Sequence, residues 1–566
     1  MVTAPLEDIL SKYEGRARDA LLPVLWDIQT AYGYISPDAA RAVSHLLRIP
    51  AADIYGVISF YSLFSDQPTG ETVIQVCTDP ACGLAGSDEI LRELCAELSI
   101  DPGDMTPDGR WTVRATTCLG LCEHAPAALI NRRGSGAFSH APITHSVDLL
   151  NGTEKPHQGI LGGQTNIFLS GTDGQRRQTL DEYGDYQGLR HALNSLTPQQ
   201  VSAEVEASGL VGRGGAGFPT GMKWRFTWQA PFQPHYVVCN ADESEPGTFK
   251  DRVLMEHRPH LLLEGIALCA YAVGAQQAFI FIRGEYPEAE QCLRDAIREA
   301  ESAGLIGDRV METDFSLHIE IRRGAGAYIC GEETALFEAI EGKRGFPRIK
   351  PPFPTTHGVF HKPTSINNVE TLCAAPGIVL HGAEWFRPWG TIKSVGLKLV
   401  SVSGHVNRPG VYEIPFGISL RALLETHCRG VRGTLQAVLM GGAAGTFLTP
   451  DEIDVPLTYE GLQAIGSTLG SGAVMVFNDT ADLRDVLRRL ARFFAHESCG
   501  KCFPCQLGTQ RQMEILERSD HALPGDRDRL SDIGFTMTQA SLCGLGQTAA
   551  AAVLSALQKW PGLVEA

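Results

Sequence analysis

The stretch ESCGKCFPC, residues 497–505, holds three cysteines on one short loop, and a fourth follows at Cys543. Thiolates a few residues apart on a loop with glycine or proline can converge on one iron–sulfur cluster, because the loop turns back and points backbone N–H groups at the sulfurs. A second quartet lies in the first quarter of the chain, in CTDPAC (residues 77–82) and CLGLC (residues 118–122). The sequence therefore predicts two iron–sulfur clusters, with ligands Cys77, Cys82, Cys118 and Cys122 for one and Cys499, Cys502, Cys505 and Cys543 for the other.

Structural zinc is the main alternative to iron–sulfur at both quartets. Its usual ligand pattern is a repeated C-x2-C pair, whereas the first quartet combines C-x4-C with C-x3-C and the second runs C-x2-C-x2-C. A zinc-stabilised scaffold without redox activity stays open as a hypothesis of another class. Disulfides are least favoured, because the opening residues MVTAPLEDILSKYEG lack the basic, apolar or arginine-rich character of a leader. We expect a cytoplasmic protein with reduced thiols.

Composition excludes two further classes. The chain has 566 residues, of which 43% are hydrophobic and 20% charged, enough for several domains with their own cores. Its net charge is −17 and its basic residues form only short clusters, so nucleic-acid binding is not expected. The most apolar stretch, from Leu261, is interrupted by Glu264 and is too short to span a bilayer. We therefore expect no direct membrane insertion.

Changes in hydrophobic period divide the chain into regions. Helical period dominates the start, and a strand–helix–strand–strand order follows, with cysteines at strand ends as in a thioredoxin-like sheet. From Leu397 a β-hairpin and a helix fit a small ubiquitin-like domain. We predict a multidomain α/β protein with these parts: a helical bundle (1–65), a thioredoxin-like domain (66–150), a linker (151–199), a nucleotide-binding domain (200–390), a ubiquitin-like domain (391–480) and a helical domain around the second quartet (481–566).

Two glycine-rich segments indicate a nucleotide site. GRGGAGFPTGMKW (residues 212–224) contains G-x-G-x-x-G, but a helix rather than a strand is expected before it, so a plain Rossmann dinucleotide site is not indicated. GAGAYICGEETAL (residues 324–336) places glycines ahead of a helix expected to begin near Glu332 and Glu333. Glycines let a backbone approach phosphate closely, and a helix N-terminus offers it free N–H groups.

Acids, amides and an aromatic accompany the glycines. NADESEPGTFKDR (residues 240–252) carries several acids on a turn, and these fit beside a nucleotide if they bind hydroxyls, amides or ring edges while Lys223 or Arg213 meets the phosphate. KPPFP (residues 350–354) and INNVETL (residues 366–372) add a phenylalanine and paired amides, which suit a planar heterocycle.

These five motifs, together with ESCGKCFPC, closely resemble the NADH-binding flavoprotein subunit of respiratory complex I and its relatives. The first 150 residues, with both cysteine pairs, resemble the small thioredoxin-like 2Fe-2S subunit of that complex. The chain thus resembles a fusion of the two subunits, as in the diaphorase subunits of soluble NAD-reducing hydrogenases and NAD-dependent formate dehydrogenases. The resemblance implies FMN, NAD(H), a 2Fe-2S cluster at the first quartet and a 4Fe-4S cluster at the second. Residues 200–390 become a Rossmann-like FMN- and NADH-binding domain.

The resemblance also implies roles for single residues. The cofactor-binding positions are Gly212, Arg213, Gly214, Gly215, Lys223, Asn240, Asp242, Glu243, Tyr328, Gly331, Glu332, Asn367, Asn368 and Thr371. Phe218 and Phe226 match the aromatics that sandwich adenine, while Lys350 and Phe353 match the lining of the nucleotide pocket.

Two acids are the candidate catalytic residues. Glu245 and Glu333 match acids near the nicotinamide amide and the ribose of the dinucleotide. A carboxylate beside the adenosine ribose repels the extra phosphate of NADPH, so we expect a preference for NADH.

The leading functional hypothesis is an NADH dehydrogenase (diaphorase) subunit that passes electrons between NAD(H), FMN and iron–sulfur clusters. Its expected partners are the catalytic subunits of a formate dehydrogenase or hydrogenase and further iron–sulfur subunits. An NADH-input subunit of a complex I-type oxidoreductase is the alternative, and two quartets are fewer than electron bifurcation normally requires. The other seven cysteines are expected as small core residues: Cys95, Cys239, Cys269, Cys292, Cys330, Cys373 and Cys428.

Overall fold

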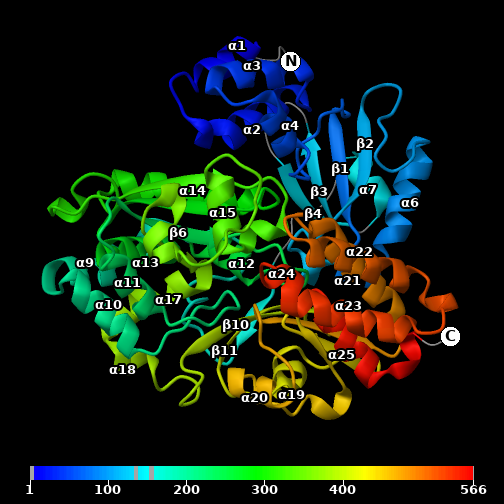
Figure 1. Ribbon diagram of the computed structural model, residues 1–566. Helices are drawn as coiled ribbons and strands as arrows, with labels where there is room; N and C mark the ends of the chain where they lie inside the picture. The colour runs from blue at the N-terminus through cyan, green and yellow to red at the C-terminus, as the bar shows by residue number, and fades with distance from the viewer. Residues whose placement is uncertain (1–4, 133–137, 144, 152–158, 565–566) are drawn as a thin grey trace.

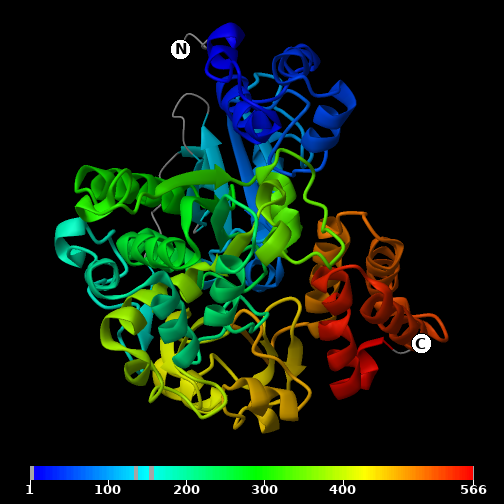
Figure 2. The ribbon, with the colours of Figure 1, turned by 60° about the vertical axis from the view of Figure 1, so that its left-hand side comes forward.

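A computed structural model describes residues 5–132, 138–143, 145–151 and 159–564. Three sheets and a C-terminal group of helices form one assembly, with the N-terminal helices on one side and the C-terminal helices packed beside the six-stranded sheet (Figures 1 and 2). The chain is a multidomain α/β protein, as expected.

The N-terminal part combines a small helical group with a four-stranded sheet. Strand β1 lies in the middle, parallel to β2 and antiparallel to β3, in the order β2-β1-β3-β4. Its elements are α1 (Leu6–Ser11), α2 (Leu21–Tyr32), α3 (Pro37–Leu47), α4 (Ala51–Ile58), β1 (Thr72–Cys77), α5 (Pro80–Leu84), α6 (Ser87–Leu98), β2 (Trp111–Thr116), β3 (Ala127–Arg132), β4 (Phe138–Pro142) and α7 (Ser146–Asn151). Strand β1 ends at Cys77, so the first quartet lies at one end of this sheet.

The central domain is built on a fully parallel sheet in the order β8-β7-β6-β9. Its elements are α10 (Pro198–Ala207), α11 (Thr220–Trp228), β6 (His235–Ala241), α12 (Lys250–His257), α13 (Pro259–Val273), β7 (Ala275–Ile282), α14 (Pro287–Ser302), β8 (His318–Arg323), α15 (Glu333–Ile340), α16 (Pro354–His357), β9 (Thr364–Asn368), α17 (Val369–His381) and α18 (Ala383–Phe386). The apolar stretch from Leu261 forms the buried helix α13. Register pairs Asn240 of β6 with Asn368 of β9, which brings two predicted site residues together at one sheet edge.

A third sheet follows and leads into the C-terminal helices. Its order is β13-β12-β14-β10-β11-β5, and it begins with the hairpin predicted from Leu397. Its elements are β10 (Leu397–Gly404), β11 (Gly410–Pro415), α19 (Leu420–Ala422), β12 (Leu435–Met440), β13 (Thr446–Leu448), α20 (Tyr459–Ala464) and β14 (Ala473–Asn478). Helices α21 (Leu483–Glu497), α22 (Phe503–Glu517), α23 (Asp526–Ala540), α24 (Gly544–Thr548) and α25 (Ala551–Lys559) carry the second quartet on their connections.

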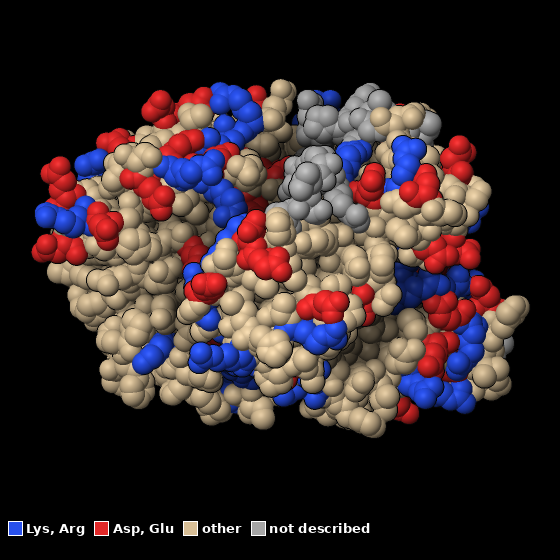
Figure 3. Space-filling model, turned by 90° about the horizontal axis from the view of Figure 1, so that it is seen from above, with Lys and Arg blue, Asp and Glu red and all other residues tan. Residues whose placement is uncertain are grey.

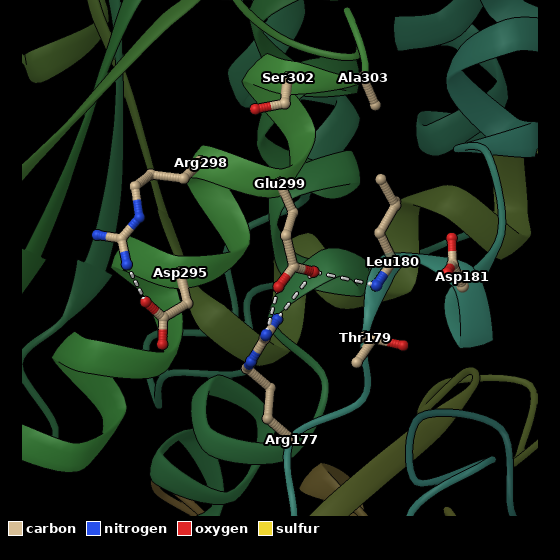
Figure 4. Close-up of a pocket in the computed structure, with 9 residues that line it drawn as sticks. All are labelled: Arg177, Thr179, Leu180, Asp181, Asp295, Arg298, Glu299, Ser302 and Ala303. Carbon is tan, nitrogen blue, oxygen red and sulfur yellow. Dashed lines mark hydrogen bonds and ion pairs between the residues drawn. The ribbon is translucent and has the colours of Figure 1, made fainter.

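The segment expected as a linker is more ordered than its composition indicated. Strand β5 (Leu161–Gly163) pairs in parallel with β11, and helices α8 (Leu180–Tyr183) and α9 (Gln187–Ser195) pack on the central domain. Figure 4 shows how Arg177 meets Glu299 of α14, which also accepts the backbone N–H of Leu180 (3.1 Å). The linker prediction is corrected for residues 159–196, because its apolar side chains and backbone N–H groups find partners in two domains; residues 152–158 lie outside the described residues.

The surface agrees with the charge balance of the sequence. On the face shown in Figure 3, acidic and basic side chains are interspersed among the described residues. No helix in the described part of the chain combines the length and the apolarity that crossing a bilayer requires.

Helices α13 and α17 cross so closely that one glycine is obligatory. A Cβ added at Gly265 would lie 2.1 Å from the carbonyl oxygen of Leu372. We predict that Gly265→Ala lowers the free energy of unfolding by about 1–3 kcal/mol, the usual cost of overpacking. Denaturant unfolding followed by circular dichroism measures this loss.

Gly56→Ala is the matched control for this prediction. Gly56 also lies in a helix, but an added Cβ would only contact the flexible side chain of Arg344 at 3.7 Å. Its stability is expected to stay at or slightly above that of the unchanged chain. Equal stability losses in the two variants would show that the helix crossing tolerates the added methyl group.

Candidate functional site

A main cavity of about 470 Å³ lies where the parallel sheet, the third sheet and α24 meet. The glycine loop (residues 212–217), the acidic loop (residues 242–249) and residues 328–332 form its walls, and loops of the third sheet close it. Its volume is in the range of cavities that enclose small ligands and cofactors.

Glycine is required where the glycine loop meets the sheet edge. A Cβ on Gly214 would come within 3.1 Å of the Asn368 side chain, and Gly215 has a φ of 116°, in the left-handed region. A backbone bridge between Val211 and Pro219 closes the loop, and α10 rather than a strand precedes it. The predicted absence of a plain Rossmann context thus agrees with the structure.

About half of the predicted cofactor-binding residues line the main cavity. They are Gly214, Gly215, Asn240, Asp242, Glu243, Glu245, Tyr328, Gly331, Glu332 and Asn368. The others lie behind its wall or outside it: Gly212, Arg213, Phe218, Lys223, Phe226, Glu333, Lys350, Phe353, Asn367 and Thr371.

Arg213, one of the two cations expected as alternatives to meet the phosphate, does not line the main cavity. Its guanidinium is buried and donates to the carbonyls of Val211 (3.0 Å), Val395 (2.7 Å) and Leu397 (3.1 Å). It also lies over the ring of Phe416. These bonds tie the glycine loop to the start of the third sheet, so the side chain serves the fold.

Three further predicted residues brace the cavity from behind. The ammonium group of Lys223 donates to the carbonyl of Ile366 (2.8 Å), and burial lowers its pKa. The Asn367 amide accepts from the indole of Trp224 (3.3 Å), and the Thr371 hydroxyl accepts the backbone N–H of Arg213 (2.8 Å). They hold the strand and loop that line the cavity.

Exposed aromatic rings and one ion-paired lysine lie outside the cavity. Phe218, Phe226 and Phe353 are 42%, 40% and 57% exposed. Lys350 donates to Glu332 (2.9 Å) and Glu333 (2.6 Å), and the first of these two acids lines the cavity. An exposed aromatic surface next to a charged pair suits the heterocycle and ribose of a nucleotide.

Buried charges missed by the sequence reasoning lie below the acidic loop. The ammonium of Lys250 contacts Asp251 (2.7 Å) and Glu370 (2.9 Å), and Asn368 donates to Asp251 (2.6 Å). Glu370 also pairs with Lys398. Lys250 and Asp251 belong to the motif NADESEPGTFKDR, but nothing in the sequence indicates that helix α12 turns them inward.

Burial raises the pKa of three acids that line the main cavity. Burial raises the pKa of Glu243 to about 8 and that of Glu245 to about 7. Burial also raises the pKa of Asp242, whose Oδ2 atom has no hydrogen-bond partner among the described residues. A ligand with hydroxyl or ring N–H donors would satisfy this oxygen.

The first quartet is buried at the end of the thioredoxin-like sheet. The sulfurs of Cys118 and Cys122 are 3.5 Å apart, and Cys77 interacts with Cys82. The thiols thus form two pairs, which suits a two-iron cluster with two thiolates on each iron. The backbone N–H of Gly120 donates to the Cys118 sulfur (3.4 Å).

The second quartet surrounds a small cavity of its own. All four cysteines line it, with Cys505 buried and the other three half-buried. The backbone N–H of Leu542 donates to Cys502 (3.5 Å). Ile329 and Leu545 line both this cavity and the main cavity, so the two sites share a wall.

The first quartet is linked to the main cavity through the acidic loop. Arg283 donates to the carbonyl of Cys118 (2.5 Å) and to that of Glu243 (2.7 Å), and pairs with Glu285 (3.1 Å). The backbone N–H of Gly247, on the acidic loop, also interacts with the sulfurs of Cys118 and Cys122. One loop therefore lines the main cavity and reaches the quartet.

The seven remaining cysteines belong to neither quartet. Six of them are buried, and Cys292 on α14 is half-buried. Cys330 lies beside the hydroxyl of Tyr61 and does not line the main cavity.

Family models match four parts of the chain. They are described as a thioredoxin-like [2Fe-2S] ferredoxin (residues 6–150), a Nuo51 FMN-binding domain (205–377), an SLBB domain (399–430) and an NADH-ubiquinone oxidoreductase-F iron–sulfur binding region (485–566). Both quartets thus fall in iron–sulfur regions, which argues against the zinc alternative. The third sheet, expected as ubiquitin-like, contains the SLBB match.

Known proteins resemble the chain at two different lengths. One of the NADH-quinone oxidoreductase F subunits, from Rhizobium meliloti, is 46% identical over 68% of this chain and 93% of its own length. The NAD-reducing hydrogenase HoxS alpha subunit of Cupriavidus necator is 35% identical over 98% of this chain and 93% of its own. A crystal structure of an NAD+-reducing [NiFe]-hydrogenase in the H2-reduced state matches with a TM-score of 0.86 and 34% identity, covering 97% of this chain and 92% of that one.

Arg283 holds the acidic loop to the first quartet, so its loss should be costly. We predict that Arg283→Gln lowers the free energy of unfolding by about 3–5 kcal/mol, because it leaves Glu285 buried without its cation. The double variant Arg283→Gln/Glu285→Gln should recover part of that loss. Denaturant unfolding of the single and double variants measures both values; a loss below about 1 kcal/mol in the single variant would contradict the assigned bridge.

Proposed function

The chain belongs to the family of the NADH-quinone oxidoreductase F subunits and the alpha subunit of NAD-reducing hydrogenase, and from this membership we propose that it is the NAD(H)-reactive diaphorase subunit of a larger NAD-linked complex. The main support for this proposal is that the chain matches the hydrogenase subunit over nearly its full length. The Rhizobium meliloti relative covers only 68% of the chain, whereas the hydrogenase subunit also spans the region of the first quartet.

The main cavity fits FMN by the chemistry of its walls. Gly214 and Gly215 leave the backbone open to a phosphate, while Asn240 and Asn368 offer amide groups from adjacent strands. The partnerless Oδ2 of Asp242 suits a hydroxyl or ring N–H of the ligand. Bound FMN supplies the exchange between hydride and single-electron chemistry, for which alignment matters more than an acid or a base.

The exposed rings beside the cavity suit the dinucleotide. Phe218 and Phe226 are available for stacking on adenine, and Glu333 with Lys350 lies within reach of a ribose. The preference for NADH over NADPH, which rests on a carboxylate near that ribose, stays a prediction. So does the cytoplasmic location.

Two exits from the main cavity suit electron transfer. Ile329 and Leu545 are shared with the lining of the second quartet, and the acidic loop joins the cavity to the first quartet through Gly247. Electron transfer requires short distances across packed protein, and the shared wall and the acidic loop support such a route to each quartet. The second quartet also has the more exposed thiols, which favours it as the exit toward another subunit.

The terminal partner stays a proposal. A hydrogenase-type partner has the support of the full-length match, and a formate dehydrogenase is the other candidate from the sequence. Isolation of the tagged chain with its native partners, followed by metal analysis, distinguishes the two candidates. Nickel indicates a hydrogenase-type partner, and molybdenum or tungsten indicates a formate dehydrogenase.

NADH should reduce both clusters of the purified chain. Under anaerobic conditions we expect FMN by flavin release and two distinct iron–sulfur EPR signals after addition of NADH. Cys118→Ser should remove only the signal of the first quartet, and Cys502→Ser only that of the second. A protein that contains zinc and gives neither signal would refute the proposal.

Binding of NADH should weaken as Glu245 ionises. Its pKa of about 7 means that the carboxyl is protonated below pH 7 and charged above it, where it repels the diphosphate of the dinucleotide. If binding needs the neutral form, the KM for NADH rises about tenfold from pH 6 to pH 8.

Glu245→Gln tests this assignment. The amide has similar size but cannot ionise, so the pH dependence of KM should flatten while the value at pH 6 changes little. A variant that keeps the full slope would place the titrating group elsewhere.

A further inference from the structure

A second cavity, of about 210 Å³, lies on the side of the central domain that carries α9, α13 and α17. Residues 167–187 cover it, and α13, α17 and α18 form its floor and sides. Its lining is mainly apolar, with Phe168, Leu261, Leu380 and Trp385 among the members. It shares no lining residue with the main cavity.

One cation faces this apolar lining. Arg258, at the junction of α12 and α13, lines the cavity and is only 6% exposed. Its Nε and Nη1 atoms are buried and have no hydrogen-bond partner within the described residues. The ring of Tyr183 lies 5.8 Å from the guanidinium carbon.

The acids near Arg258 are engaged elsewhere. Glu264 accepts the backbone N–H of Leu189 (2.9 Å) and the hydroxyl of Tyr183, and burial raises its pKa. Glu413 accepts the backbone N–H groups of residues 167–169. Neither forms an ion pair with Arg258 among the described residues. Their carboxylates organise the covering segment instead.

A buried guanidinium without an acceptor is unfavourable. Guanidinium stays protonated in proteins, and burial of a cation costs free energy unless a paired anion and hydrogen bonds offset it. Burial also lowers the pKa of Arg258, which is the shift expected for a buried cation that lacks a paired anion. A native structure that keeps such a group next to an open volume calls for a ligand to satisfy it.

We propose that this cavity binds a small monocarboxylate with an apolar body. The planar N–H groups of Arg258 suit a carboxylate, and one guanidinium matches one negative charge. The apolar walls match a ring or a short hydrocarbon chain. The volume corresponds to about seven waters at about 30 Å³ each, which is room for a single ring bearing a carboxylate.

The polar remainder of the lining is consistent with a single negative charge. Glu264 disfavours a second charge close to the first, which argues against phosphate esters and dicarboxylates. Gln187 and His381, also on the lining, can meet the edges of the bound molecule.

The cavity also borders the helix that leaves the main cavity. Cys373 and Ala374 of α17 line it, and the N-cap of the same helix is Asn368, which lines the main cavity. A bound carboxylate thus rests on an element shared with the cofactor site, although the binding inference does not depend on the proposed function.

Benzoate is the probe for the test, with benzamide as its neutral isostere. Isothermal titration and thermal unfolding of the full chain are carried out at constant ionic strength, with chloride replaced step by step by benzoate. We expect saturable binding of benzoate to one site and a higher unfolding temperature, with neither effect from benzamide or chloride.

Arg258→Met removes the charge and keeps most of the volume. It should weaken benzoate binding about ten- to a hundredfold, the range for loss of hydrogen bonds to a charged group. Its own unfolding temperature should equal or exceed that of the unchanged chain, since an unpaired buried charge is lost. Arg258→Lys keeps the charge without the planar fork and should bind with intermediate affinity.

Arg421→Met is the matched control. Its guanidinium is exposed and paired with Asp454, far in sequence from the second cavity, so benzoate binding should not change. Absence of saturable benzoate binding, equal binding of benzamide, or full binding by Arg258→Met overturns the proposal. An equal effect of chloride alone would show that the site binds inorganic anions. It would overturn the proposal that the ligand has an apolar body.

Discussion

The architecture depends on the hydrogen bonds of one buried guanidinium, that of Arg283. Arg283 binds the backbone carbonyl of Cys118 in one domain, the carbonyl of Glu243 in another, and the carboxylate of Glu285. A cation this deep is stable only when every donor has a partner, so the three acceptors fix one another's positions. The acidic loop is thereby held against the first quartet while its other side lines the main cavity.

Buried charges below the main cavity follow the same rule. Lys250 touches both Asp251 and Glu370, and this double pairing outweighs burial and raises its pKa. Lys398 pairs with one carboxylate among the described residues, that of Glu370, and also donates to the carbonyl of Leu399 (2.8 Å); burial lowers its pKa to about 7. Two lysines on one carboxylate thus differ in the strength with which they hold a proton.

The motifs that hold the ligands could be predicted from the sequence, whereas the direction in which single side chains point could not. Cysteine spacing and the glycine loops are local signals, and the structure brings the first quartet together as two pairs and the second around one small cavity. Arg213 shows the limit: it sits inside a glycine-rich nucleotide motif, yet the backbone turns it toward Val395 and Leu397 of a distant segment. Residues 159–196 have the composition of a linker, and their anchors, such as Glu413 for the N–H of Phe168, are too far away in sequence to be foreseen.

Strand β5 has a consequence for solubility. Without it, β11 would be the border of the third sheet and would present a row of unpaired N–H and C=O groups, which other chains can extend. The parallel pairing of Leu161 with Val411 covers part of that row. A C-terminal fragment that begins after β5, and so keeps β11 without its neighbour, would therefore need another means to prevent strand-by-strand aggregation at β11.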